Sequence, residues 1–97
     1  MPPDEFYRGG NSLQPRPHEV RIDPTTGLLL PTHGVSVFDR PDSLEHFGGA
    51  YRVPGVPVEL RIIQRGRDPH HHEIVPARPL TLAEYERALQ QIVLVPV

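Results

Sequence analysis

The chain has 97 residues, a formal net charge of −2 and no cysteine. This length allows one domain, and the charge excludes the strongly basic class of nucleic-acid and membrane-surface binders. Without cysteine, neither a disulfide nor a thiolate metal site can form. The first residues are acidic and no apolar run is long enough to span a bilayer. We therefore expect no secretory signal peptide and no membrane span, so that any export would need a route without a cleaved signal.

Short strands with proline- and glycine-rich connections are expected along the chain, which contains 13 Pro and 8 Gly. Residues 1–4 are expected to be disordered. Residues 5–9 predict a first strand in which Phe6 and Arg8 share one face. Residues 19–23 alternate between charged and apolar side chains, which is typical of a half-exposed strand.

The most distinctive prediction is a buried strand at residues 34–40, which read Gly-Val-Ser-Val-Phe-Asp-Arg and end in a turn signal. Alternation along a strand places Val35 and Val37 on one face and Ser36 and Phe38 on the other. Two interpretations of the serine remain open. Its hydroxyl either caps a backbone group within the core or lines a pocket.

The second half of the chain begins with a predicted short helix. Its apolar residues Leu44 and Phe47 are three positions apart and are expected to face the core. Three strands are then expected, at residues 49–53, 57–64 and 70–75.

Thr81 and Glu84 form a capping box, which predicts the start of a helix. The apolar face of this helix consists of Leu82, Tyr85, Leu89 and Ile92. Residues 93–97 either add an edge strand or form a frayed end. The expected fold class is α+β, with one domain that spans residues 1–97.

Four titratable side chains follow one another in the run His70-His71-His72-Glu73. On a strand, His70 and His72 point to one side, and His71 and Glu73 point to the other. Two histidines at this spacing can share a zinc ion, but such a site needs a third protein ligand that the sequence does not fix. We therefore assign no metal ligand. The remaining interpretations are an exposed histidine run and a cleft in which the His71 imidazole lies beside the Glu73 carboxylate.

Two further residues are candidates for ligand binding. Arg8 precedes a glycine pair that lets the backbone approach a ligand, so its guanidinium could bind a pyrophosphate, although an ordinary surface arginine fits the pattern too. His33, just before the Gly34 strand entrance, could bind a ribose hydroxyl or simply occupy a turn. No Gly-x-Gly-x-x-Gly or phosphate-loop motif occurs.

Three blocks in order carry a family resemblance. Residues 6–8 read Phe-Tyr-Arg, residues 34–40 read Gly-Val-Ser-Val-Phe-Asp-Arg, and residues 71–79 read His-His-Glu-Ile-Val-Pro-Ala-Arg-Pro. They are similar to an aromatic-Tyr-Arg strand, a Gly-Thr-Ser-Val-Phe-Asp-Arg block and a His-x-x-Ile-x-Pro-Ala-basic-Pro block. The chain thus resembles the small toxin family with an ADP-ribosyltransferase-like fold that is delivered by type VI secretion and neutralised by a cognate immunity protein.

The resemblance implies a compact split β-sheet of short strands with a C-terminal helix and a cleft for NAD. Arg8, Tyr7 and His33 would contact the nucleotide, with Arg8 on phosphate. Ser36 would position the ribose or nicotinamide side, and His71 would hydrogen-bond the ribose, which makes these two the expected catalytic residues.

The chain departs from the family in three respects. Val35 replaces a threonine, Glu73 has no counterpart, and the segment at residues 9–33 is shorter.

Three functional hypotheses follow. The first is a bacterial toxin that acts in the cytoplasm on an NAD-type dinucleotide, or that transfers ADP-ribose to a target, and that has an immunity or antitoxin protein as its partner. The alternative is a non-catalytic protein-binding module on the same fold. The third is a histidine-ligated metal hydrolase, which depends only on residues 70–72.

Overall fold

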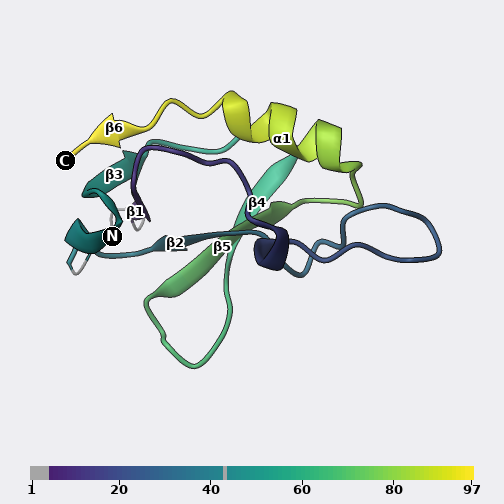
Figure 1. The fold of residues 1–97 in the computed structure, drawn as a ribbon, viewed down its shortest axis with the longest axis horizontal. Helices are drawn as coiled ribbons and strands as arrows, with labels where there is room; N and C mark the ends of the chain where they lie inside the picture. Colours follow the sequence, from purple (N-terminus) through teal and green to yellow (C-terminus); the bar gives the residue numbers. More distant parts are fainter. Residues whose placement is uncertain (1–4, 43) are drawn as a thin grey trace.

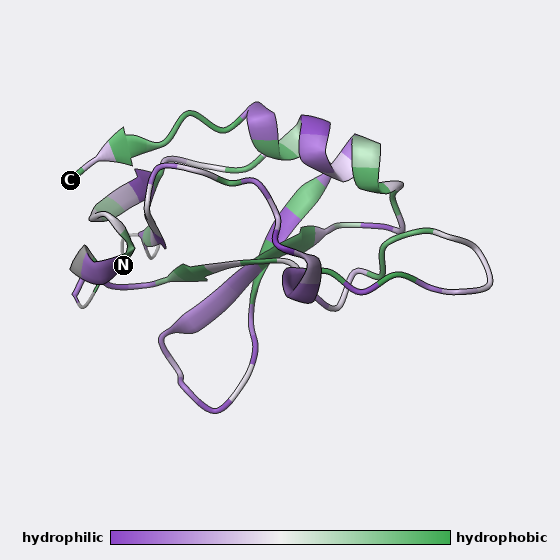
Figure 2. Ribbon diagram, in the orientation of Figure 1, coloured by the Kyte–Doolittle hydropathy of each residue, from purple (hydrophilic) through white to green (hydrophobic). Residues whose placement is uncertain are grey.

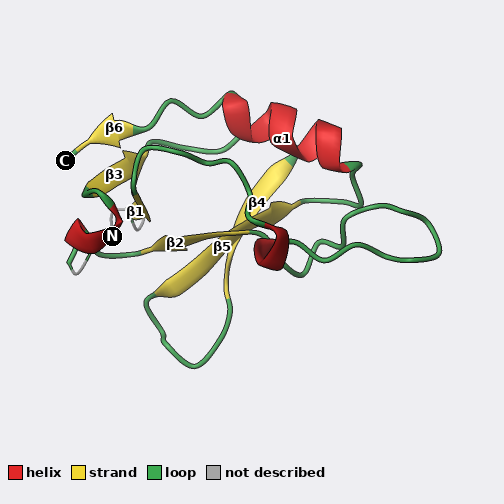
Figure 3. Ribbon diagram, viewed as in Figure 1, coloured by secondary structure: helices red, strands yellow, loops and turns green. Residues whose placement is uncertain are grey.

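The computed structural model describes residues 5–42 and 44–97, so the predicted disorder at residues 1–4 lies outside the described residues. The strands are β1 (Phe6–Gly9), β2 (Val35–Phe38), β3 (Ala50–Val53), β4 (Leu60–Gln64), β5 (His71–Pro76) and β6 (Val95–Pro96). One α-helix, α1 (Leu82–Gln90), and two 3-10 turns, η1 (Pro17–Glu19) and η2 (Glu45–Phe47), complete the described elements. The α+β class is confirmed (Figures 1 and 3).

The strands form one antiparallel sheet in the order β4-β5-β2-β1-β3-β6. Among the described residues, the ladder between β2 and β1 contains only the pair Tyr7↔Phe38, whereas β1 pairs with β3 at four positions and β2 with β5 at four. The sheet therefore consists of two three-stranded halves with a narrow join. Figure 1 shows β1, β3 and β6 gathered on one side of the molecule and β2, β4 and β5 on the other.

The core lies between the sheet and α1. Val35 and Val37 are fully buried while Ser36 and Phe38 are half-buried, as the predicted alternation requires. Figure 2 shows that β5 changes from hydrophilic at its start to hydrophobic at its end, so only its second half joins the core. The helix contributes Tyr85, Ala88 and Leu89 to the same cluster.

The helix begins as the sequence predicts. The Thr81 side chain accepts a hydrogen bond from the Glu84 N–H at 3.1 Å, and the Glu84 carboxylate accepts one from the Thr81 N–H at 2.9 Å. Leu82 is the exception on the predicted apolar face, since its side chain is exposed. The C-terminal residues form β6 at the sheet edge, so residues 93–97 contribute an edge strand rather than a frayed end.

The buried Tyr85 hydroxyl joins α1 to the sheet. It donates to the Ile74 carbonyl at 2.6 Å and accepts from the Val35 N–H at 3.0 Å. A side chain at Gly34 would collide with the Ile74 carbonyl and with the Tyr85 hydroxyl, so only glycine fits beside this contact.

The predicted strand at residues 19–23 is wrong. Glu19 ends η1 and is buried, while Ile22 is half exposed and makes only an isolated bridge to Leu29. The reason is that Pro17 favours the first turn of a helix, and the Glu19 carboxylate finds partners inside the molecule.

Two smaller expectations also fail. Phe47 was expected in the core but its side chain is exposed over η2, whereas Leu44 is buried. The strand expected at residues 57–64 begins only at Leu60, and Val58 is 90 % exposed in the turn before it. Among the described residues, neither the length nor the apolar character of any helix suffices to cross a membrane.

Candidate functional site

The three histidines at the start of β5 lie in three different environments. His70 Nδ1 is 2.7 Å from the Asp39 carboxylate, His71 contacts Ser36, and the His72 ring packs edge-on against Phe6. Because the rings diverge, they do not converge on one ion. Within residues 5–42 and 44–97, no group of three or more His, Cys, Asp or Glu side chains is placed to hold a metal.

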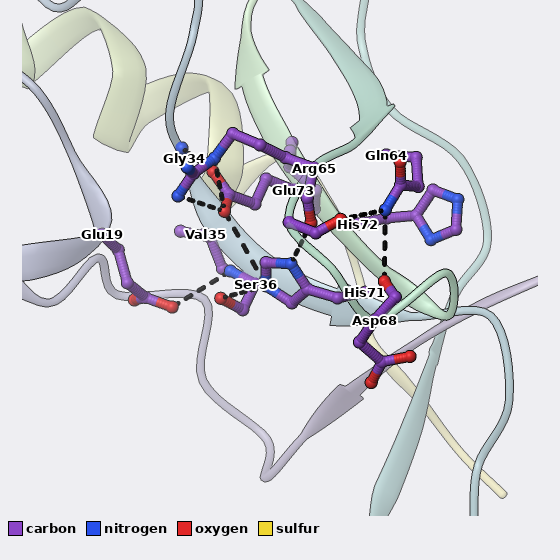
Figure 4. A network of polar contacts seen from close by, with 12 residues as sticks. Glu19, Gly34, Val35, Ser36, Gln64, Arg65, Asp68, His71, His72 and Glu73 are labelled. Atoms are coloured by element: carbon purple, nitrogen blue, oxygen red, sulfur yellow. Dashed lines mark hydrogen bonds and ion pairs between the residues drawn. The ribbon is translucent and has the colours of Figure 1, made fainter.

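Ser36 and His71 meet across the β2–β5 ladder, where the Ser36 Oγ lies 3.1 Å from His71 Nε2 (Figure 4). The other ring nitrogen, Nδ1, lies 2.7 Å from the Arg65 carbonyl. A carbonyl can only accept, so Nδ1 carries the proton of the neutral ring and Nε2 is left to accept the serine proton. The backbone thus fixes the tautomer in which His71 can act as a base toward Ser36.

Glu73 supports this pair from the same face of β5. Its Oε2 lies 3.7 Å from His71 Nε2 and is bound by the Arg65 side chain at 2.9 Å, while its Oε1 accepts from the Gly34 N–H at 3.0 Å. The carboxylate is almost fully buried, but the Arg65 side chain is 45 % exposed. Arg65 and the Gly34 N–H thus hold the Glu73 carboxylate in place, with its Oε2 near the His71 ring.

Glu19 and Arg8 hold the backbone of Ser36 from the opposite side. The Glu19 Oε2 accepts from the Ser36 N–H at 3.0 Å, and Arg8 Nη1 donates to the Ser36 carbonyl at 2.8 Å. Arg8 and Glu19 also form an ion pair at 3.0 Å, buried at both ends. The two side chains thereby replace a backbone ladder at the place where β1 diverges from β2.

The ionisation of Glu19 follows from these contacts. Burial by itself raises the pKa of this carboxyl group. Hydrogen bonds from Arg8 and from the N–H groups of Ser36 and Arg16 outweigh burial and leave the pKa below its ordinary value. Glu19 is therefore a carboxylate at neutral pH.

A cavity of about 160 Å³ opens beside this arrangement. Its walls include Arg8, Arg16, His18, Glu19, Ser36, Phe38, Phe47 and His71. A neighbouring hollow of about 450 Å³ shares Arg8, Gly9, Arg16 and Phe47 with it. The first cavity is too small for a dinucleotide, but the two together reach the roughly 300–1,000 Å³ typical of small-molecule sites.

The structure brings together three of the five residues predicted for the site, namely Arg8, Ser36 and His71. Tyr7 does not line the cavity, and its hydroxyl donates to Glu5 at 2.7 Å, a hydrogen bond that raises the pKa of Tyr7. His33 contacts Thr32 instead, and its pKa is lowered by burial and by the charge of Arg65. We therefore do not place Tyr7 and His33 in the cavity.

The role expected for Arg8 also changes. Its Nε donates to the Ser12 carbonyl at 3.0 Å, and its two terminal nitrogens bind Glu19 and Ser36, so most of its donors are engaged. Arg16 lines both hollows and is exposed, and no hydrogen bond from its guanidinium to another described residue is present. Arg16 is thus the better placed of the two to bind an anionic ligand.

Glu19 and Arg16 are the site residues that the sequence patterns missed. The alternation at residues 19–23 placed Glu19 on a solvated face, and nothing nearby in the chain indicates its partners at positions 8 and 36. The capping pattern of Pro17 followed by Glu19 is the local signal that could have favoured a turn over a strand.

Comparison with known proteins finds no match to this chain among protein-family models, curated proteins or solved structures.

Proposed function

We propose that this protein is a bacterial toxin with an ADP-ribosyltransferase-like fold that breaks the glycosidic bond between nicotinamide and ribose in NAD. The observation that carries the proposal is the pair of Ser36 and His71, which share a cavity wall and are flanked by the buried carboxylates Glu19 and Glu73. The three sequence blocks that resemble the toxin family supply these same serine and histidine positions.

The charges around the serine favour one type of substrate carbon. Acyl transfer builds a negative oxyanion and needs free donors beside the nucleophile. Here the Ser36 N–H is already bound by Glu19, and a second buried carboxylate, Glu73, lies beside the His71 ring. Cleavage of a glycosidic bond to nicotinamide instead develops positive charge on the ribose, which a nearby carboxylate stabilises.

The combined size of the two hollows is sufficient for an extended dinucleotide. The cavity beside Ser36 would take the nicotinamide riboside, and the neighbouring hollow would take the adenosine half. Arg16, which lines both, would bind the pyrophosphate between them. The division of the sheet into two halves, with the cavity at their narrow join, fits the split sheet that the resemblance implies.

The proposal is tested by inducing the protein in a bacterial culture and measuring growth and cellular NAD. We expect growth arrest with loss of NAD, relieved by Ser36→Ala and by His71→Gln. Thr26→Ala and His72→Gln are the matched controls and should remain toxic, because Thr26 lies in an exposed loop and His72 points to Phe6.

Normal growth and unchanged NAD with abundant folded protein would overturn the proposal. That outcome would favour the alternative of a non-catalytic binding module. A partner protein that is encoded with a toxin should restore growth when both are produced together, which makes an immunity or antitoxin protein a further expectation of the same proposal.

A further inference from the structure

We infer that the Ser36 hydroxyl is itself the first acceptor of the ADP-ribosyl group, so that the reaction passes through a covalent bond between this chain and its substrate. The inference rests on the proposed function, because it takes NAD as the donor. It goes beyond that function by assigning the nucleophile and the base.

The geometry around Ser36 is that of an activated nucleophile. The hydroxyl lies 3.1 Å from His71 Nε2, the nitrogen that the Arg65 carbonyl leaves without a proton. A nucleophile, a base and a group that orients the base are the three parts that covalent catalysis requires. If Ser36 only positioned the ribose, no base whose tautomer is fixed toward it would be needed.

The backbone of Ser36 is immobilised on both sides. Its N–H donates to Glu19 and its carbonyl accepts from Arg8, and these side chains, 4 % and 6 % exposed respectively, have little freedom. A nucleophile held in this way loses little further entropy when it reacts, since orientation is already fixed in the folded protein. Figure 4 shows Glu19 on one side of Ser36 and His71 on the other.

The chemistry balances with water as the only further reactant. The Ser36 Oγ forms a bond to C1′ of the ribose while the bond from C1′ to the nicotinamide nitrogen breaks, and its electron pair neutralises the pyridinium. The hydroxyl proton passes to His71 Nε2, where Glu73 Oε2 at 3.7 Å stabilises the imidazolium. Water then attacks C1′, His71 returns its proton to the Ser36 Oγ, and the proton lost by water is released.

The experiment incubates the purified protein with NAD and follows two quantities in acid-quenched samples. One is nicotinamide released, and the other is the intact mass of the protein, with the modified residue located by peptide fragmentation. A third measurement is the incorporation of isotopically labelled nicotinamide into NAD, because reversal of the first step requires a retained ADP-ribosyl group. Folding of each variant is checked by circular dichroism.

We expect one ADP-ribosyl group on Ser36, a burst of nicotinamide stoichiometric with protein, and exchange of labelled nicotinamide. Ser36→Ala should lose the adduct and the exchange. His71→Gln should slow adduct formation by about 100-fold or more, the usual contribution of a general base. Thr26→Ala and His72→Gln should behave like the wild type.

The outcomes separate this inference from the proposed function. Nicotinamide release without an adduct or exchange, or an adduct on another residue, would overturn the inference and leave the proposed function standing. No release and no adduct would overturn both.

Discussion

Arg8 and Glu19 form a buried ion pair whose members each hold one backbone group of Ser36. The pair therefore does two things at once. It joins β1 to η1 across the narrow part of the sheet, and it satisfies the Ser36 N–H and carbonyl where no neighbouring strand reaches them.

Removing the charge of Glu19 should destabilise the fold strongly. Glu19→Gln leaves the Arg8 guanidinium buried without its counter-ion, and breaking a buried pair in this way costs about 3–5 kcal/mol. Urea unfolding measures the loss, and Arg67→Gln, in the exposed turn before β5, is the control that should change stability little.

A double substitution distinguishes this clamp from an ordinary buried pair. Replacing both members by apolar residues is often neutral, because no buried charge remains. Arg8→Met with Glu19→Leu should instead stay destabilised by about 1–3 kcal/mol or more, since the Ser36 N–H and carbonyl lose their partners. Full recovery in the double variant would show that the contacts to Ser36 contribute nothing to stability.

The free energy of unfolding should fall on acidification, because the pKa of Glu19 is lowered in the folded protein. Its pKa is lower in the folded protein than in the unfolded chain, so it contributes stability that is present above the unfolded value of about 4.3 and is lost as the pH falls through the folded value. His33 acts in the same direction from about pH 6.5 downward, because burial lowers its pKa and the unfolded chain takes up the proton first.

Unfolding free energies measured from about pH 7 down to about pH 3 check this expectation. Glu19→Gln should flatten the acid part of the profile, and His33→Gln should flatten only the part near pH 6. An unchanged acid profile in Glu19→Gln would mean that other carboxylates govern acid unfolding.

The Tyr85 hydroxyl should contribute strongly to the free energy of unfolding, because two buried backbone groups bind to it. Tyr85→Phe leaves the Val35 N–H and the Ile74 carbonyl buried without this partner, at a cost of about 1–3 kcal/mol for each group left unsatisfied. Tyr7→Phe removes a hydroxyl that meets only the exposed Glu5 carboxylate and should cost much less. The comparison needs only thermal or urea unfolding of the two variants.

Arg16 should affect substrate binding rather than chemistry. Arg16→Gln removes the exposed guanidinium that lines both hollows, and we expect a KM for NAD raised about 10-fold with kcat changed little. Arg67→Gln again serves as the matched arginine control. An unchanged KM in Arg16→Gln would indicate that Arg8, and not Arg16, contacts the phosphate.

The sequence predicts well what depends on neighbouring residues. The cap at Thr81 and the alternation through Val35, Ser36 and Val37 involve positions a few residues apart, and both are confirmed. The assignment of His71 to a cleft with Ser36 came from a resemblance rather than from local pattern, and the structure places the two in contact.

The burial of Glu19 could not be predicted in this way. Its partners are Arg8, eleven positions away, and Ser36, seventeen positions away. A charged residue that begins an alternation of charged and apolar side chains has the pattern of a half-exposed strand, and only the divergence of β1 from β2 creates the buried space that Glu19 fills. The exposure of Phe47 has a similar origin, since Phe47 lies against Gly9 on β1 instead of entering the core.

The strand order has a consequence for how the protein is made. β1 precedes the other strands in the sequence but lies in the interior of the sheet, between β3 and β2, and β2 in turn pairs with β5. β5 must therefore leave the ribosome before His71 can reach Ser36, and the edge of β3 stays unpaired until β6 follows. Such long-range pairing also folds slowly. A nascent or truncated chain that ends before β5 cannot bring His71 to Ser36, so the contact between these two side chains forms only after β5 has been made.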